Sequence, residues 1–195
     1  MTIFTAKPYA ELEPGMEATT TRLVRADDLY VFAHASGNVN PMHLPEYDGD
    51  GDGTPEAVAP SAWVAALISG VLGNQLPGPG TLYLSQDLRF TGRAHAGETL
   101  TVCVRVEEKG PDGEVTLATR VDGPGGTICE GRARVKAPDH ALSFDVKGVP
   151  GLTVQSHANF DRLLDRARPL PPIPTAVVCP ESADALMGAM LGRDE

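Results

Sequence analysis

The chain has 195 residues, a net charge of −10 and a pI near 4.9. This acidity argues against nucleic acids and anionic membranes as partners, because their phosphates require a basic protein face. Apolar residues make up 42% of the chain but aromatic ones only 5%, so aliphatic and small side chains must form the core. Residues 1–15 lack the pattern of a signal peptide, and no apolar run approaches the ~18 residues of a membrane span. The three cysteines are far apart, which predicts a cytoplasmic protein without disulfides or a zinc site.

The first third of the chain predicts a strand, a helix and an acidic loop. We expect a strand over residues 16–24. A helix should follow from Asp27 to Ser36, because the apolar residues within this segment keep helical spacing. Gly37 suits the end of that helix, because glycine adopts a left-handed conformation without steric strain. The Asn40-Pro41 turn then leads into an acidic loop over residues 46–56.

The acidic loop contains a partial calcium-binding pattern. The segment Asp48-Gly-Asp-Gly-Asp-Gly53 matches the first half of an EF-hand loop. An EF-hand needs an acidic ligand at its twelfth position, where this chain has Ala59. The pattern therefore favours a solvated acidic turn, and we predict no metal site.

A second helix, over residues 60–76, is apolar almost all round and contains no charged residue. A helix of this composition must be surrounded by protein. Small side chains would let a sheet wrap closely around it, and they stand at Ala62, Ala65, Ala66, Ser69, Gly70 and Gly73. The Pro- and Gly-rich segment after Gln75 is expected to end the helix sharply.

Four segments with a two-residue apolar period follow that helix. They cover residues 81–90, 100–106, 115–121 and 127–135, and turns rich in Gly and Asp separate them. In the first segment, one face is predicted to carry Leu82, Leu84, Gln86, Leu88 and Phe90. A buried apolar helix followed by four antiparallel strands predicts an α+β hot-dog fold, in which a curved sheet wraps around one helix.

The composition changes after Ala137. Residues 1–137 are predicted to form the hot-dog domain, and residues 138–174 an irregular segment with a Pro-rich linker. A short helix is expected over 159–168. In the final segment, 175–195, we expect one strand and one helix, which together cannot form an independent core.

The stretch from Phe32 to His43 carries the clearest chemical signal. Polar groups cluster there at a helix end, next to an apolar fold. Histidine is the usual proton-transfer residue near neutral pH, whereas the amide of Asn38 can orient a water molecule but cannot accept its proton. The pattern therefore suggests a site with one base and an amide partner. In the alternative interpretation, Asn38 and Asn40 serve the turn and His43 fills a hydrogen-bonded niche.

This stretch resembles the hydratase motif of the MaoC-like family, Phe-x-x-x-Ser-Gly-Asp-x-Asn-Pro-x-His. The matching positions are Phe32, Ser36, Gly37, Asn40, Pro41 and His43. A second block, from Leu72 to Phe90, resembles the end of the family's central helix and its next strand. The similarity covers roughly residues 10 to 137 and includes two long motifs in the right order.

The resemblance implies an (R)-specific enoyl-CoA hydratase, a lyase of fatty-acid metabolism that adds water reversibly to trans-2-enoyl-CoA. His43 would act as acid–base, Asn38 would hold the water, and the backbone N–H of Ser61 would stabilise the enolate. Substrate-binding positions would be Ser36, Gly37, Asn40, Ala62, Gln75 and Gln86. The implied assembly is a homodimer or larger homo-oligomer, and no cofactor is expected beyond the CoA thioester substrate.

Two departures from the family pattern keep other functions open. Asn38 stands where the family has Asp, and losing such a group typically lowers the rate about 10²–10⁴-fold. The central helix opens with Ala59-Pro-Ser-Ala62 instead of Ala-His-Gly-Met, so Ser61 adds a side chain that could donate a hydrogen bond or crowd the thioester. The alternatives are an impaired hydratase, a non-catalytic acyl-CoA-binding module, a hot-dog thioesterase and a structural dimerisation domain.

The tail carries its own resemblance. Residues 163–180, with Leu186 and Gly188, are similar to the junction in bifunctional proteins that join an enoyl-CoA hydratase domain to a phosphate acetyl- or butyryltransferase domain. Residues 175–195 would then be the truncated start of the second domain, and no transferase activity is expected from them.

Overall fold

The computed structural model describes residues 2–154, 158–171, 182–184, 186–187 and 190. The chain divides into two compact units, Met1–Thr153 and Val154–Glu195. No helix among the described residues is both long and apolar enough to cross a membrane.

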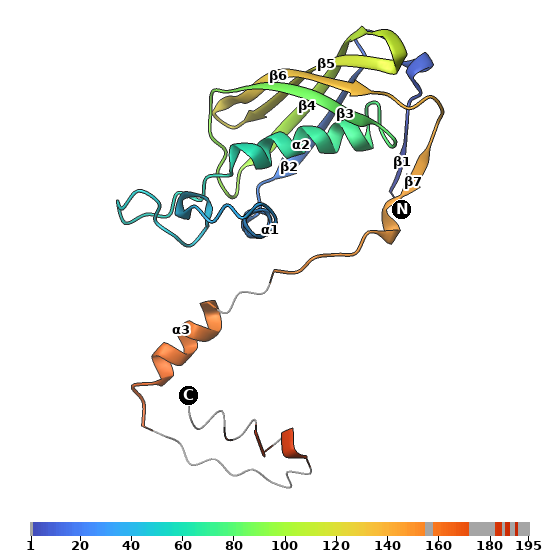
Figure 1. Ribbon diagram of the computed structural model, residues 1–195. Coiled ribbons are helices and arrows are strands. Elements are labelled where there is room, and N and C mark those ends of the chain that lie inside the picture. The colour runs from blue at the N-terminus through green and yellow to red at the C-terminus, as the bar shows by residue number, and fades with distance from the viewer. Residues whose placement is uncertain (1, 155–157, 172–181, 185, 188–189, 191–195) are drawn as a thin grey trace. The chain divides into compact units, whose positions relative to one another are not determined.

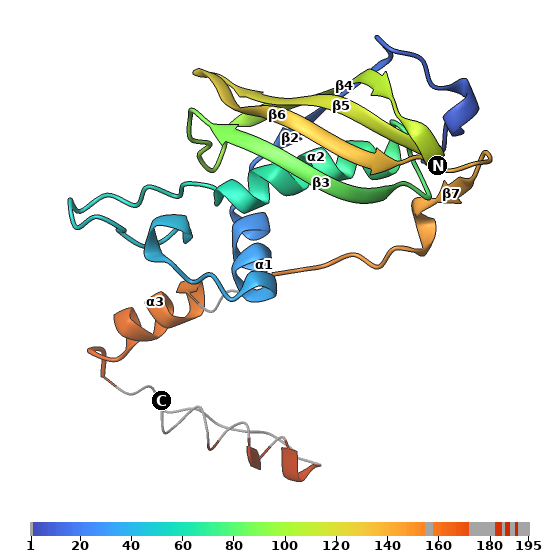
Figure 2. The same ribbon diagram turned by 45° about the horizontal axis from the view of Figure 1, so that its top comes forward.

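A five-stranded antiparallel sheet packed against one helix forms the first unit (Figures 1 and 2). The helix, α2, covers Ser61–Asn74. The strand order is β2-β4-β5-β6-β3, so β2 and β3 are the edges. The strands are β2 Glu17–Leu23, β3 Leu82–Phe90, β4 Thr99–Lys109, β5 Glu114–Gly123 and β6 Gly126–Lys136. The predicted helix and the four predicted strands that follow it are confirmed.

Alternating side chains explain why one face of the sheet packs against α2. In β4, Leu100, Val102, Val104 and Val106 are fully buried, while the residues between them face away from the helix. Their partners in the core include Ile68 of α2. Burying one such aliphatic side chain stabilises the fold by about 1.5–3 kcal/mol.

A β-bulge at Leu84 changes which residues of β3 share a face, so the predicted faces of this strand are wrong on one side of the bulge. Tyr83 pairs with Val135 and Ser85 with Arg134, so two steps along β3 oppose one step along β6. The extra residue shifts the alternation by one position. Tyr83 therefore shares the inward face with Gln86, whereas strict alternation along the sequence predicts that they lie on opposite faces.

The single chain covers only one side of α2. Trp63, Val64, Ile68, Val71 and Leu72 are buried against the sheet. The opposite side exposes the small residues Ser61, Ala62, Ala66, Ser69 and Gly70. The prediction that protein surrounds the helix is thus wrong for one chain on its own.

The N-terminal part supplies a second helix, α1, over Ala26–Ser36. It ends at Gly37, whose φ of 74° places it in the left-handed region as predicted. Two short strands, β1 (Ile3–Thr5) and β7 (Ser143–Asp145), pair with each other and had no clear sequence signal. Single 3₁₀ turns stand at Tyr9–Glu11, Pro41–His43, Pro111–Gly113 and Val146–Gly148.

The second unit contains α3, Ala158–Ala167, which confirms the predicted short helix. The strand predicted within the final segment, 175–195, lies outside the described residues, as does part of the helix predicted there.

Candidate active site

A ladder of side-chain hydrogen bonds shapes the turn after α1. The Ser36 hydroxyl donates to the carbonyl of Phe32 (2.6 Å) and accepts from the Asn38 N–H (3.2 Å). The Asn38 amide oxygen accepts from the Asn40 N–H (3.3 Å), and the Asn40 amide oxygen from the Met42 N–H (3.2 Å). Asn38 and Asn40 therefore do serve the turn, and their side-chain NH₂ groups have no acceptor among the described residues.

A separate hydrogen bond, to the backbone of Val58, fixes His43. Its Nδ1 lies 2.7 Å from the carbonyl oxygen of Val58. A carbonyl oxygen can only accept, so Nδ1 carries the hydrogen and the neutral ring presents an unprotonated Nε2. The half-buried imidazole is thus held in the tautomer that a general base requires.

Val58 joins this histidine to the start of α2. Its N–H donates to the carbonyl of Met42 (3.0 Å), and the next residue, Ala59, donates its N–H to the carbonyl of Ala94, in the connection between β3 and β4 (2.8 Å). Ser61 follows three residues after Val58, which limits the distance between their Cα atoms to about 10 Å. Because no side chain caps α2, the N–H groups of its first turn are available to another acceptor.

The predicted site residues fall into three places. Those from Ser36 to His43 share one turn, and Val58 connects that turn to Ser61 and Ala62. Gln75 instead follows the last residue of α2, which puts it roughly 20 Å along the helix from Ser61. Gln86 lies within β3.

Gln86 contacts two residues, Tyr83 and Thr119, that the sequence pattern does not indicate as part of the site. Its amide oxygen accepts from the Tyr83 hydroxyl (2.5 Å), and its NH₂ donates to the Thr119 hydroxyl (3.0 Å) and to the carbonyl of Asp87 (2.9 Å). Thr119 is almost fully buried, and Gln86 satisfies its hydroxyl. Only the bulge brings Tyr83 to this face, and bulges leave little trace in sequence patterns.

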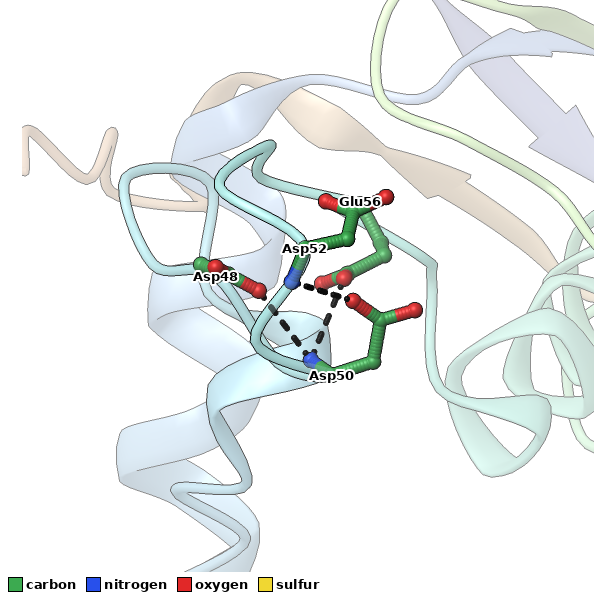
Figure 3. A group of neighbouring side chains, drawn as sticks. All are labelled: Asp48, Asp50, Asp52 and Glu56. Carbon is green, nitrogen blue, oxygen red and sulfur yellow. Dashed lines mark hydrogen bonds between the residues drawn. The ribbon is translucent and has the colours of Figure 1, made fainter.

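The acidic loop brings four carboxylates together: Asp48, Asp50, Asp52 and Glu56 (Figure 3). One oxygen from each lies within 4.8 Å of the others. Backbone N–H groups of the loop donate to them, which holds the pKa values of Asp48 and Glu56 below their usual range. Exposed acidic groups commonly gather in this way without an ion, so the absence of a metal stays a prediction.

Comparison with known proteins identifies the family. The model of the MaoC-like domain matches residues 6–122. The chain belongs to the MaoC-like family. An (R)-specific enoyl-CoA hydratase of Rhodospirillum rubrum is 32% identical over 131 residues, which cover 67% of this chain and 91% of the relative. A 3-hydroxybutyryl-CoA dehydratase of Methylorubrum extorquens is 33% identical over 131 residues, covering 67% and 83%.

Two solved structures similar to this chain agree with the fold. The unliganded R-hydratase of Pseudomonas aeruginosa superposes with a TM-score of 0.73 at 37% identity, covering 79% of this chain and all of that one. The R-hydratase of Aeromonas caviae gives a TM-score of 0.59 at 35% identity, covering 65% and 98%. These similarities confirm the predicted α+β hot-dog fold.

Proposed function

We propose that this MaoC-like chain is an (R)-specific enoyl-CoA hydratase, which adds water reversibly to a trans-2-enoyl-CoA. The observation that carries the proposal is the contact between His43 Nδ1 and the Val58 carbonyl, because it leaves Nε2 free as a base. Relatives named as hydratases and as a 3-hydroxybutyryl-CoA dehydratase support the same reaction.

One base suffices for the reaction. Nε2 of His43 takes a proton from a water molecule that the NH₂ group of Asn38 holds, while the water oxygen bonds to C3. The electrons of the C2–C3 double bond move into the thioester, and the Ser61 N–H donates to the resulting enolate oxygen, aided by the positive end of α2. The imidazolium of His43 then returns the proton to C2. One water is added, and the enzyme ends unchanged.

The working unit is a homodimer in this proposal. Strand β3 is an edge strand that exposes Leu82, Tyr83, Leu84 and Phe90, and an exposed apolar edge invites pairing. The uncovered small-residue side of α2 would be closed by the second copy, which would complete an apolar path for the acyl chain.

The alternative is an acyl-CoA-binding module without turnover. Asn38 favours it, because a carboxamide cannot replace a carboxylate as proton acceptor and its oxygen is already bound by the Asn40 N–H. The fold and the thioester ligand would be the same in both cases, so only catalysis separates them.

Hydration of crotonyl-CoA, followed by the loss of enoyl-thioester absorbance, tests the proposal on the full chain beside Asn38→Asp. Turnover by the parent supports the hydratase. Turnover by Asn38→Asp alone would support the binding module, since the scaffold would then lack only its carboxylate. Release of free CoA would indicate a thioesterase instead, and failure of both proteins to hydrate or bind any acyl-CoA would leave a dimerisation domain.

A further inference from the structure

The acidic loop packs tightly against the backbone beside His43. A Cβ atom added to Gly49 would lie 2.5 Å from the Cα of Met42 and 2.6 Å from its nitrogen. Real Cβ atoms essentially never approach backbone so closely, so glycine alone fits there. The loop therefore rests on the residue that immediately precedes the proposed base.

Glu56 holds Gly49 in this position. One carboxylate oxygen accepts from the Gly49 N–H (2.8 Å) and the other from the Asp50 N–H (3.2 Å). Figure 3 shows the Glu56 carboxylate reaching across the loop to the backbone nitrogen of Asp50. The bond from Gly49 is the largest of several causes that lower the pKa of Glu56, so the carboxylate stays ionised in neutral solution.

Two hydrogen bonds connect Met42, which Gly49 contacts, to the imidazole of His43. The Met42 carbonyl accepts from the Val58 N–H (3.0 Å), and the Val58 carbonyl accepts from His43 Nδ1 (2.7 Å). Between Glu56 and Val58, Ala57 has a φ of 45°, a left-handed conformation that a non-glycine residue keeps only when its surroundings impose it. Gly49 and Val58 thus hold Met42 from two sides.

We propose that Glu56 and Gly49 are positioning residues that brace Met42 and Val58, and thereby keep His43 in its Nδ1–H tautomer with Nε2 aimed at the water. The catalytic role of His43 rests on the proposed function, but the tautomer does not. Neither Glu56 nor Gly49 touches the reacting atoms in this proposal.

The test uses two variants with matched controls in the full chain. Glu56→Gln removes one of the two acceptor oxygens, and Gly49→Ala forces the loop away from Met42. Asp52→Asn removes the same charge from the same loop, but the Asp52 side chain bonds only the Thr54 N–H among the described residues. Gly125→Ala adds a methyl group where nothing lies within 4 Å.

The first readout is the tautomer of His43, measured by ¹⁵N NMR of the imidazole at pH 8, where an unperturbed histidine is neutral. A His43→Ala spectrum assigns the signal. We expect a protonated Nδ1 in the parent and in both controls, and a mixture of tautomers in Glu56→Gln and Gly49→Ala. This readout stays valid even if the chain does not hydrate crotonyl-CoA.

The second readout is crotonyl-CoA hydration. Misplacing a reacting group can lower a rate by up to about 10²-fold, so we expect kcat to fall about 10-fold in both test variants with KM unchanged. An unaltered His43 signal in Glu56→Gln would overturn the proposal even if Gly49→Ala failed to fold. An equal effect of Asp52→Asn would also overturn it, because loop charge and not the brace would then be responsible.

Discussion

The Nδ1 nitrogen of His43 lies 2.7 Å from the carbonyl oxygen of Val58, three residues before α2 begins. The proposed base and the proposed enolate donor are therefore attached to one short backbone segment. The N–H of Ala59 bonds this segment to Ala94 in the connection between β3 and β4, so neither group can move far without breaking a hydrogen bond. This attachment keeps Nε2 of His43, the proposed proton-transfer atom, at a constant position relative to the N–H of Ser61.

Replacing His43 with Ala should lower kcat for hydration by about 10²–10⁴-fold, because it removes the imidazole that the Val58 carbonyl holds as the proposed acid–base. Steady-state rates with crotonyl-CoA measure the effect. His34→Ala is the matched control, since His34 is exposed in the last turn of α1. Normal turnover by the His43 variant would remove the proposed mechanism.

Replacing Ser61 with Pro tests the enolate donor without removing the helix. Proline is well tolerated at the first helical position, where the N–H has no partner within the helix, and the φ and ψ of Pro60 suit a following proline. The variant should fold, yet lose about 10²–10³-fold in kcat as expected for one lost donor. Ser61→Ala keeps the N–H and should retain activity; equal rates for the two variants would exclude this donor.

Periodicity was sufficient to predict most of the fold. The helical spacing before Gly37 and the alternation in β4 to β6 each follow directly from which side chains are buried. It failed at Leu84, because a bulge shifts the alternation without changing composition. It also failed for β1 and β7, whose three-residue strands are too short to show a period.

The site could be predicted only in part from the sequence. The motif around Asn38 and His43 is local, so spacing and family resemblance were enough to find it. Val58 contributes through its backbone carbonyl, which any residue type provides, and the contact spans 15 positions. The contact of Gly49 with Met42 depends on how the loop folds back, and the repeated glycines of that loop gave no sign of which one is needed.

Strand β3 should be the centre of the homodimer interface. Leu84 is 46% exposed at the bulge of this edge strand, and a lysine there should block edge-to-edge pairing. We expect Leu84→Lys to convert dimers into monomers of 20.5 kDa in light scattering after gel filtration. Leu152→Lys, at a residue 81% exposed outside the sheet, should leave the mass unchanged. A parent chain that is monomeric at assay concentration would contradict the proposed assembly.

Gly131 should be essential for the pairing of β3 with β6. A Cβ atom there would lie 1.8 Å from the carbonyl oxygen of Asp87, so Gly131→Ala must push β3 outward. Overpacking of this kind typically destabilises a protein by about 1–3 kcal/mol, and a backbone clash should reach the upper part of that range. Urea denaturation measures it against Gly125→Ala, and equal midpoints for the two variants would show that the strand yields freely.

Ionisation of the Cys129 thiol should lower the free energy of unfolding at high pH. Burial in the core, with a smaller contribution from Asp122, raises the pKa of its thiol from 9.0 to about 11. A raised pKa favours the neutral thiol in the folded state, so this stabilisation is full below pH 9 and is lost as the pH rises towards 11. A difference of this size corresponds to roughly 3 kcal/mol.

Urea denaturation at pH 8 and pH 10.5 should therefore show a smaller decrease in stability for Cys129→Ala than for the parent, because the alanine variant has no thiol to ionise. The same burial should protect Cys129 from iodoacetamide at pH 8, whereas denaturant should expose it. Cys103 is the internal comparison, since it is only half-buried and faces away from α2. Rapid native labelling of Cys129 would show that the core around β6 opens readily, and the predicted pH dependence would then disappear.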